Sequence, residues 1–183
     1  MQKRLLLNSQ HLKITISRLC HQLIENHDDF SHSVILGMQP KGIFLAERIK
    51  SELEKITGKP IQLGYLDTTF YRDDFRRRNE VITANETKVP FIIEDKKVIL
   101  IDDVLYTGRT VRAAMDAMIA YGRPAKVELL ILIDRIHSRD IPVEANYVGK
   151  RVNTIQSQKV LVELKEQNKK TDNIWLIDKE QIK

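Results

Sequence analysis

The amino-acid sequence predicts an α/β fold with a largely parallel central sheet flanked by helices. Two segments, 97–104 and 127–134, are rich in Val, Ile and Leu, which is typical of parallel strands that are covered on both faces. A helical pattern at 109–121 lies between them and ends at Gly122. The order strand, loop, helix, strand forms a βαβ unit, which places the two strands parallel in one sheet.

The remaining segments extend this pattern toward both ends of the chain. We expect a helix with Ser9 as its N-terminal cap, because Leu12, Ile16 and Leu19 recur at helical spacing. The other expected elements are a strand at 34–38, a helix at 43–53, a strand at 61–70 and two strands at 159–164 and 174–177. Together they predict a single domain over residues 1–183, a length that is sufficient for one hydrophobic core.

The composition narrows the class of partner and the compartment. Lys and Arg number 30 against 25 Asp and Glu, and the net charge of +5 favours an anionic partner, either a phosphorylated metabolite or a nucleic acid. The single cysteine, Cys20, forms neither an intrachain disulfide nor a metal site, which fits a reducing cytoplasm. The apolar run at 5–7 is too short for an export signal, and no stretch is long enough to span a membrane. We therefore expect a cytoplasmic protein without membrane contact.

The most informative segment is the end of the first apolar strand and the loop that follows it. Two adjacent acids, Asp102 and Asp103, end the strand, and the loop carries Thr107, Gly108 and Thr110. Open parallel sheets bind ligands at this carboxyl end. Free N–H groups at the start of the next helix, with two threonine hydroxyls, suit a phosphate, and the carboxylates suit ribose hydroxyls and the outer shell of magnesium. The segment therefore predicts a site for a 5-phosphorylated ribose.

Acids followed by a threonine-capped helix also occur in ordinary βα turns. The functional assignment therefore depends on the complete segment and not on single residues. Residues 98–110, VILIDDVLYTGRT, resemble the phosphoribosyl pyrophosphate signature of type I phosphoribosyltransferases at all positions. The continuation to 117, the segment at 71–74 and the Asp-Arg pair at 134–135 resemble one branch, the PyrR family of pyrimidine regulators that are also uracil phosphoribosyltransferases. The resemblance covers nearly all the chain up to about residue 164.

This resemblance implies a type I phosphoribosyltransferase fold with a flexible lid at about 71–90, and it implies roles for individual residues. The residues expected to bind ribose 5-phosphate are Asp102, Asp103, Val104, Leu105, Tyr106, Thr107, Gly108, Arg109 and Thr110. The expected pyrophosphate loop is Pro40, Lys41 and Gly42, the expected base-binding residues are Asp134 and Arg135, and the expected catalytic residues are Asp102, Asp103 and Arg72.

The same resemblance implies the reaction, the cofactor and the assembly. Uracil would displace pyrophosphate from phosphoribosyl pyrophosphate and give UMP. No nucleophilic side chain is required, so catalysis would depend on positioning and electrostatics. Mg²⁺ would be carried by the substrate near Asp102 and Asp103, without direct protein ligands. Members of the family form dimers and tetramers, so we expect a homodimer or a homotetramer.

The family also binds a stem-loop in the leader of a messenger RNA, and the sequence partly matches this second activity. The residues at the corresponding positions are Arg18, His21, Lys150 and Thr154. The family's run Asp-Arg-Gly-His-Arg-Glu-Leu-Pro is altered at 134–142, and a position that is usually basic is Glu144. An acid repels a phosphate backbone, which weakens the RNA hypothesis. The pyrophosphate loop also differs, with Pro40-Lys41 where the branch commonly has Thr-Arg.

Three hypotheses remain open. The first is a uracil phosphoribosyltransferase that also regulates pyrimidine genes through RNA in response to UMP. The second is a purine phosphoribosyltransferase, for hypoxanthine, guanine or xanthine, which would share the ribose-phosphate site but not the branch-specific segments. The third is a regulator that binds UMP and RNA with little catalytic activity.

Overall fold

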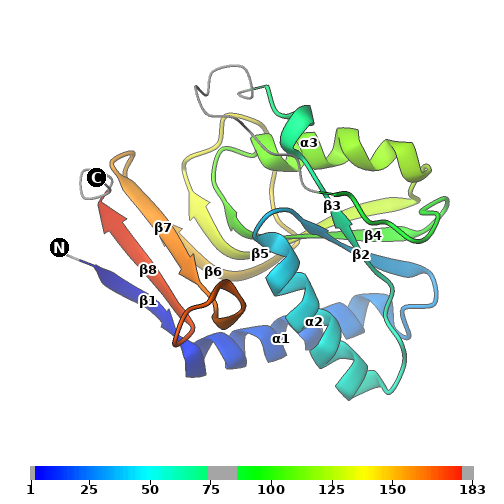
Figure 1. Ribbon diagram of the computed structural model, residues 1–183, viewed down its shortest axis with the longest axis horizontal. Helices are drawn as coiled ribbons and strands as arrows, with labels where there is room; N and C mark the ends of the chain where they lie inside the picture. The colour runs from blue at the N-terminus through cyan, green and yellow to red at the C-terminus, as the bar shows by residue number, and fades with distance from the viewer. Residues whose placement is uncertain (1–2, 74–85, 179–183) are drawn as a thin grey trace.

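The computed structural model describes residues 3–73 and 86–178, and a five-stranded parallel sheet forms its centre (Figure 1). Its strands are β2 (Ser33–Met38), β3 (Leu63–Leu66), β4 (Lys97–Leu105), β5 (Lys126–Ile136) and β6 (Tyr147–Asn153). They lie in the order β3-β2-β4-β5-β6, and every neighbouring pair is parallel. The predicted α/β class, the parallel sheet and the βαβ unit are confirmed.

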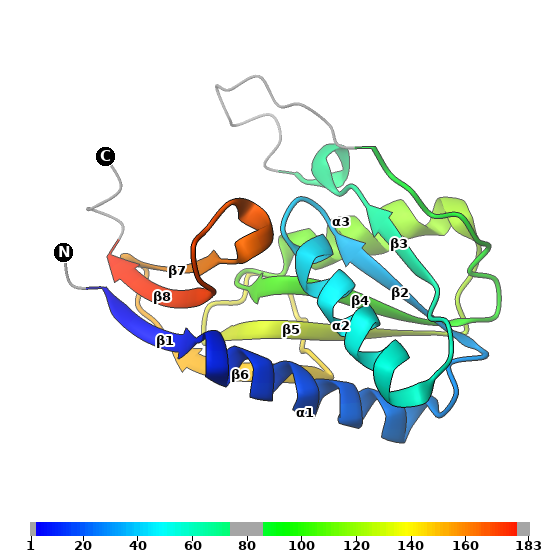
Figure 2. The same cartoon turned by 60° about the horizontal axis from the view of Figure 1, so that its bottom comes forward.

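Helices cover both faces of this sheet (Figure 2). α1 (Ser9–His27) and α2 (Gly42–Thr57) pack on one face. α3 (Arg109–Met118), which a 3-10 turn continues to Tyr121, packs on the other. Because both faces are covered, the central strands are apolar nearly throughout. Within the described parts of the chain, no helix combines the length and the apolar character needed to cross a membrane.

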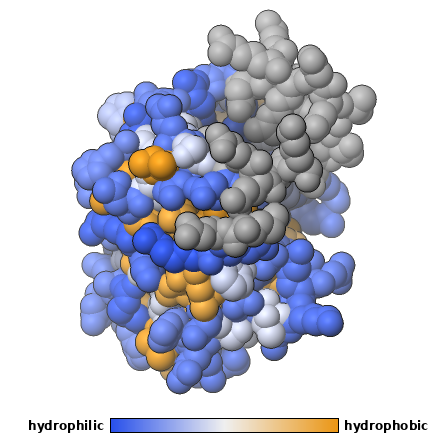
Figure 3. All heavy atoms as spheres, turned by 90° about the vertical axis from the view of Figure 1, so that its left-hand side faces the viewer, coloured by the Kyte–Doolittle hydropathy of each residue, from blue (hydrophilic) through white to orange (hydrophobic). Residues whose placement is uncertain are grey.

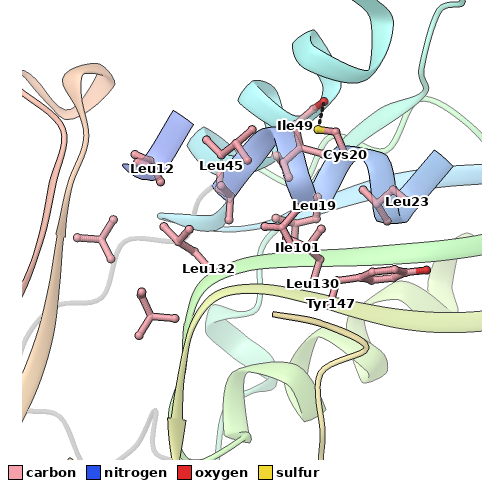
Figure 4. Close-up of a cluster of buried hydrophobic side chains, with 14 of the residues drawn as sticks. Leu12, Leu19, Cys20, Leu23, Leu45, Ile49, Ile101, Leu130, Leu132 and Tyr147 are labelled. Carbon is pink, nitrogen blue, oxygen red and sulfur yellow. Dashed lines mark hydrogen bonds between the residues drawn. The ribbon is translucent and has the colours of Figure 1, made fainter. Parts of the chain in front are cut away.

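The larger apolar core lies between the sheet and helices α1 and α2 (Figure 4). Leu12, Leu19 and Leu23 of α1 face the strands, from which Ile101 and Leu130 project, and each of these side chains is at most 1% exposed. Full burial of one such side chain contributes roughly 1.5–3 kcal/mol. The helices are therefore packed tightly against the strands whose carboxyl ends carry the candidate site.

A second sheet, antiparallel and three-stranded, is formed by both ends of the chain. Its strands are β1 (Arg4–Asn8), β7 (Gln158–Glu163) and β8 (Asn173–Asp178), in the order β1-β8-β7. Figures 1 and 2 place it beyond the end at which β4 terminates. Figure 3 views the molecule from this end, where the described surface is mostly hydrophilic with small apolar areas. The last two strands were predicted, whereas β1 was not.

Arg48 of α2 fastens this small sheet to the rest of the molecule. Its Nε donates to Glu166 over 2.8 Å and its NH1 donates to Asp172 over 3.0 Å. Both acids lie in the connection between β7 and β8, and Asp172 also accepts from the N–H of Lys165 over 2.9 Å. Charge-assisted bonds of a guanidinium with two carboxylates are the strong kind. The small sheet is thereby held in a defined place relative to α2.

Two local predictions were wrong. The cap of α1 is Asn8, whose side chain accepts from the N–H of His11 over 2.8 Å, because the hydroxyl of Ser9 donates instead to the carbonyl of Asp172. The strand expected at 61–70 is confined to β3, because the carboxylate of Asp67 accepts from the N–H of Thr69 over 3.0 Å and turns the chain.

The predicted lid at about 71–90 is described only at its ends, because residues 74–85 lie outside the described residues. At its far end Lys88 forms an antiparallel bridge with Tyr65 of β3, with two N–H to carbonyl bonds of 2.8 Å. Lys88, two residues before the predicted end of the lid, therefore lies at the edge of the sheet beside β3.

A buried polar cluster joins the last turn of α1 to the amino ends of the strands. His27 Nδ1 lies 2.8 Å from Ser33 Oγ, and His27 Nε2 lies 2.7 Å from Glu128 Oε2, which also accepts the hydroxyl of Tyr147 over 3.1 Å. Burial lowers the pKa of His27, although the carboxylate opposes this shift. Burial would raise the pKa of Glu128, but the hydrogen bonds from Lys126 and Tyr147 and the attraction of His27 lower it overall. The lowered pKa of His27 favours the neutral imidazole, whose Nε2–H can donate to the Glu128 carboxylate.

Acidification should therefore weaken the fold through His27. The pKa of His27 in the folded protein lies below its ordinary value of 6.5, so its contribution is complete above pH 6.5 and declines as the pH falls below it. One proton taken up on unfolding changes the free energy of unfolding by at most ~1.4 kcal/mol per pH unit. Urea denaturation between pH 7 and pH 5 should show a shallower pH dependence for His27→Gln than for the wild type.

His21→Gln is the matched control, because His21 is exposed on the same helix. This variant should keep the wild-type slope. If His27→Gln also keeps the wild-type slope, another group takes up the proton and the account of the cluster is wrong.

Candidate active site

The two acids predicted to bind ribose lie at the carboxyl end of β4, in the middle of the sheet. Asp103 is buried and Asp102 is half-buried, and the N–H of Asp103 donates to Asp102 Oδ1 over 2.8 Å. Burial raises the pKa of both carboxyls, and the charge of Asp103 raises that of Asp102 further. The attraction of Lys41 only partly offsets the effect of burial on Asp103. Hydroxyl donors or a cation would stabilise such a pair, which suits the two hydroxyls of a ribose.

The predicted phosphate loop, 106–110, joins β4 to the first turn of α3. Gly108 is the N-terminal cap of α3 and has a φ of 91°, and no side chain caps the helix. A Cβ at Gly108 would lie 2.5 Å from Cγ1 of Val143, so the position needs glycine for space as well as for conformation. The first N–H groups of a helix have no intrahelical partner. Together with the hydroxyls of Thr107 and Thr110, they form an arrangement that suits an anion.

Arg72, the catalytic residue predicted at the start of the lid, reaches this loop. Its NH1 donates to Thr110 Oγ1 over 2.7 Å. The next residue, Asp73, forms an ion pair with Arg109 on the first turn of α3. The described start of the predicted lid therefore lies against the phosphate loop, while residues 74–85 are outside the described residues.

The predicted pyrophosphate loop brings the first turn of α2 against the end of β4. A Cβ at Gly42 would press on the carbonyl oxygen of Ile101 and would lie 3.0 Å from Cα of Asp102. Backbone atoms cannot rotate away, so only glycine permits this approach. Lys41 and Pro40 are exposed beside it, and the peptide bond before Pro40 is cis. The predicted pyrophosphate and ribose residues therefore lie side by side.

Asp134 and Arg135, predicted to lie beside the base, are buried at the end of β5. Arg135 Nε donates to Thr154 Oγ1 over 2.9 Å, and its Cζ lies 3.9 Å from the centroid of the Tyr106 ring. The Asp134 carboxylate forms an ion pair with Arg139. Both side chains thus have partners within the chain at the border of the phosphate loop, and their contact with a base stays a prediction.

The residues predicted to bind RNA lie on and near the face formed by α1 and β6. Arg18 of α1 donates to the backbone of β6 over 2.7 Å, Lys150 donates to the backbone of β1 over 2.9 Å, and Thr154 accepts from the end of β5. His21 is exposed on α1. The side chain of Glu144 is 86% exposed. RNA binding by these residues stays a prediction.

The sequence reasoning assigned no role to Arg139, although its guanidinium lies between the predicted subsites. Its NH1 donates to the carbonyl oxygens of Tyr106, over 2.6 Å, and of Arg135, over 2.9 Å. The N–H of the next residue donates to the carbonyl of Thr107 over 3.0 Å. The available signal was its position four residues after Arg135, but an arginine in a polar loop is more often solvated.

The donor set of the site fits the predicted magnesium ion only in company with a substrate. Within 3–73 and 86–178, no three His, Cys, Asp or Glu side chains are placed to hold a metal together. The two adjacent carboxylates of Asp102 and Asp103 are hard oxygen donors of the kind that magnesium prefers. A phosphorylated substrate would supply the other oxygen ligands.

Comparison with known proteins identifies the class that this fold and site define. The sequence model of the phosphoribosyl transferase domain family matches residues 4–167. A hypoxanthine phosphoribosyltransferase of Trypanosoma cruzi is 14% identical with a TM-score of 0.72, over 96% of each chain. The hypoxanthine-guanine enzyme of Leishmania tarentolae, solved in complex with GMP, is 14% identical with a TM-score of 0.68, over 97% of this chain and 98% of that chain. At these identities the likeness shows the fold alone, which is that of the type I phosphoribosyltransferases.

Closer relatives narrow the class. The Bifunctional protein PyrR of Bacillus velezensis is 40% identical over 98% of this chain and 99% of the relative. The Bifunctional protein PyrR of Bacillus subtilis is 41% identical over 90% of this chain and 92% of the relative. The chain belongs to the PyrR family, as the sequence motifs predicted.

Gly42→Ala should disturb the contact between α2 and β4. Because the added methyl group would press on backbone atoms of Ile101 and Asp102, we expect the free energy of unfolding to fall by ~1–3 kcal/mol. Displacement of Asp102 should also weaken binding of phosphoribosyl pyrophosphate. Urea denaturation measures the first effect and isothermal titration calorimetry measures the second.

Gly58→Ala, at the other end of α2, is the comparison variant, because a Cβ at Gly58 meets nothing within 4 Å. Its cost is confined to the positive φ of 68° at that position, and ligand binding should not change. Unchanged stability and binding in Gly42→Ala would show that α2 can move away from β4.

Proposed function

We propose that the protein transfers the 5-phosphoribosyl group of phosphoribosyl pyrophosphate to uracil, giving UMP and pyrophosphate. The observation that carries this proposal is the meeting of three features at one edge of the sheet. These are the adjacent carboxyls of buried Asp103 and half-buried Asp102, the uncapped start of α3, and the close approach of Gly42 to β4. Phosphoribosyl pyrophosphate presents ribose hydroxyls, a 5-phosphate and a pyrophosphate to these features in turn. Membership of the PyrR family favours uracil as the base.

The reaction needs positioning and charge more than a reactive side chain. A ring nitrogen of uracil attacks the anomeric carbon while the bond to pyrophosphate breaks, and positive charge develops on the sugar. Asp102 and Asp103 would hold the ribose hydroxyls and stabilise that charge. The N–H groups of the phosphate loop, with Thr107 and Thr110, would bind the 5-phosphate, and Arg72 would add positive charge beside it. Such fixed groups lower the barrier because they need no rearrangement during the reaction.

The leaving group and the base would lie on either side of the ribose. We assign Pro40, Lys41 and Gly42 to the pyrophosphate; the positive charge of Lys41 lowers the pKa of Asp103 against the larger effect of burial. The base side is assigned to Asp134 and Arg135. Mg²⁺, when bound, neutralises negative charge on the leaving pyrophosphate. We further propose a cytoplasmic homodimer or homotetramer.

We also propose a second role as a UMP-responsive regulator that binds the leader RNA of pyrimidine genes. The curated relatives carry the name Bifunctional protein PyrR, which states two functions. In this chain the basic residues Arg18 and Lys150 lie on neighbouring elements, α1 and β6, with His21 exposed close by. Cationic groups on one face suit a phosphate backbone. Exposed Glu144, whose carboxylate lies 3.9 Å from Arg151 of β6, reduces the positive charge beside that strand.

Formation of UMP from uracil and phosphoribosyl pyrophosphate with Mg²⁺ is the experiment that tests the main proposal, with hypoxanthine and guanine as alternative bases. Turnover with uracil alone would support it. Turnover with a purine would keep the ribose-phosphate site and overturn the choice of base. Tight binding of UMP without turnover would favour a regulator with little catalytic activity.

Asp103→Asn should remove catalysis and leave the fold intact. The amide keeps the shape of the carboxyl but cannot carry the charge that stabilises the sugar cation, so we expect kcat to fall by roughly 10²-fold. Thermal unfolding should change little, because the substitution also removes the repulsion between two adjacent carboxyls. Asp116→Asn, on the exposed side of α3, is the matched control and should keep full activity. Full activity in Asp103→Asn would move the ribose site elsewhere.

Glu144→Arg should strengthen RNA binding if the proposed face is used. One more cation next to the phosphate backbone should lower Kd and steepen the dependence of log Kd on log salt by about one unit. Asp116→Arg makes the same change of charge on α3, on the opposite face of the sheet, and should have a smaller effect. Filter binding to a leader stem-loop at several salt concentrations measures both. Equal effects of the two variants would mean that RNA binding depends only on the net charge of the protein and not on the proposed face.

A further inference from the structure

We propose that Arg139 is a positioning residue that orients the backbone of the phosphate loop. The inference rests on the proposed phosphoribosyltransferase function, because it concerns how that site binds the 5-phosphate. Arg139 does not belong to the predicted binding residues, and it would act through the peptide groups that it holds.

All three nitrogens of the Arg139 guanidinium are engaged with the chain. Nε donates to the carbonyl of Val143 over 3.2 Å, and NH1 donates to the carbonyls of Tyr106 and Arg135 over 2.6 and 2.9 Å. NH2 forms an ion pair with the carboxylate of Asp134. A planar guanidinium can bind several acceptors in one fixed geometry, which a lysine cannot do. Arg139 therefore joins the end of β4, the end of β5 and its own loop.

The ion pair with Asp134 is the anchor of this arrangement. The side chain of Arg139 is 21% exposed and that of Asp134 is 5% exposed, so water screens the pair little. Arg151 also approaches the same carboxylate, but at 3.7 Å and with a side chain that is 58% exposed. Arg139 is therefore the main counter-charge of Asp134, and the pair holds the guanidinium in one position.

The segment that follows Arg139 continues the contact along the phosphate loop. The N–H of Asp140 donates to the carbonyl of Thr107 over 3.0 Å, and its carboxylate accepts from Arg109 Nε over 3.2 Å. Gly108 leaves the space that Val143 occupies, since a Cβ there would lie 2.5 Å from Val143 Cγ1. Segment 139–143 thus covers one side of the phosphate loop from Tyr106 to Arg109.

Peptide geometry turns these contacts into an orientation of the loop. Among the described residues only the bond between Gln39 and Pro40 is cis, so the peptides that follow Tyr106 and Thr107 are trans. In a trans peptide the N–H points away from the C=O of the same group. Because Arg139 binds the carbonyl of Tyr106, the N–H of Thr107 points away from segment 139–143. In the same way, the hydrogen bond from the N–H of Asp140 to the carbonyl of Thr107 directs the N–H of Gly108 away from segment 139–143.

The N–H groups of Thr107 and Gly108, which immediately precede α3, are thereby turned to one side, where they add to the positive end of the helix. Without the guanidinium, the carbonyl of Tyr106 keeps only the long contact of 3.5 Å from Ser138 Oγ, so the peptide between Tyr106 and Thr107 can rotate. The first N–H of the anion site would then be lost, although no binding residue had changed. The affinity for the 5-phosphate should fall more than the affinity for the nucleoside part of the ligand.

The test compares binding of UMP with binding of uridine, which lacks the phosphate. We expect Arg139→Met to weaken UMP by about 10- to 100-fold and uridine by a much smaller factor, measured by isothermal titration calorimetry. Arg139→Lys keeps the counter-charge of Asp134 but cannot reach all the carbonyls, so it should fold and show an intermediate loss for UMP. Arg151→Met, which removes the more exposed partner of Asp134, should leave the ratio of UMP to uridine affinity at the wild-type value.

The outcomes separate the proposals. Equal weakening of UMP and uridine by Arg139→Met, or an unchanged UMP affinity, would overturn the positioning role. If Arg139→Met does not fold, Arg139→Lys decides: a reduced ratio of UMP to uridine affinity supports the role, and a wild-type ratio overturns it. If the wild-type protein itself binds no UMP, the proposed function fails and this inference fails with it.

Discussion

The backbone pairing of β4 with β2 on one side and β5 on the other is the interaction on which the rest of the structure depends. A strand with neighbours on both sides and helices on both faces is buried along its middle, so polar groups are tolerated only at its two ends. The carboxyl end carries Asp102 and Asp103. Because β2 runs parallel, the helix that follows it, α2, begins at the same edge, and Gly42 meets β4 there. Residues some sixty positions apart in the sequence form one site for this reason.

Acidic and basic side chains occupy different parts of the site. The positive charge of Lys41 acts on Asp103 at the end of β4, while the phosphate loop carries or contacts the guanidinium groups of Arg72, Arg109 and Arg139. Each of these arginines is held by an acceptor within the chain, so its position is set before any ligand arrives. Fixed charges of this kind favour a ligand with hydroxyls at one end and phosphate at the other, and they reduce the cost of ordering the site on binding.

The sequence was sufficient for the parts of the fold that have a local pattern. The apolar runs of β4 and β5 and the helix between them were predicted correctly, because burial on both faces leaves a direct trace in the sequence. β1 was missed, since a five-residue strand has no distinctive pattern and its partner, β8, lies at the other end of the chain. The cap of α1 was misplaced by one residue, because Asn8 and Ser9 are both good capping residues and only the tertiary contact of Ser9 decides between them.

The same distinction applies to the site. The segment from Asp102 to Thr110 could be recognised because its acids, threonines and glycine are the residue types that suit a ribose and a phosphate. The contacts of Arg139 could not be predicted from the sequence, because its partners are mainly backbone carbonyl oxygens, which every sequence contains. The burial of Arg135 depends on its contacts with Thr154 and with the Tyr106 ring, which lie in separate segments of the chain and cannot be read from its own strand.

The small sheet has a consequence for how the protein is made. β1 is synthesised well before its strand partner in that sheet, β8, and Arg4 pairs with Leu176. During synthesis the parallel sheet and its helices can assemble while β1 still lacks this partner, and the long separation between the two strands makes their pairing a late and slow step. β8 therefore completes the sheet to which β1 belongs. A truncated chain that ends before β8 would expose the backbone of β1 as a free strand edge, which other chains could join.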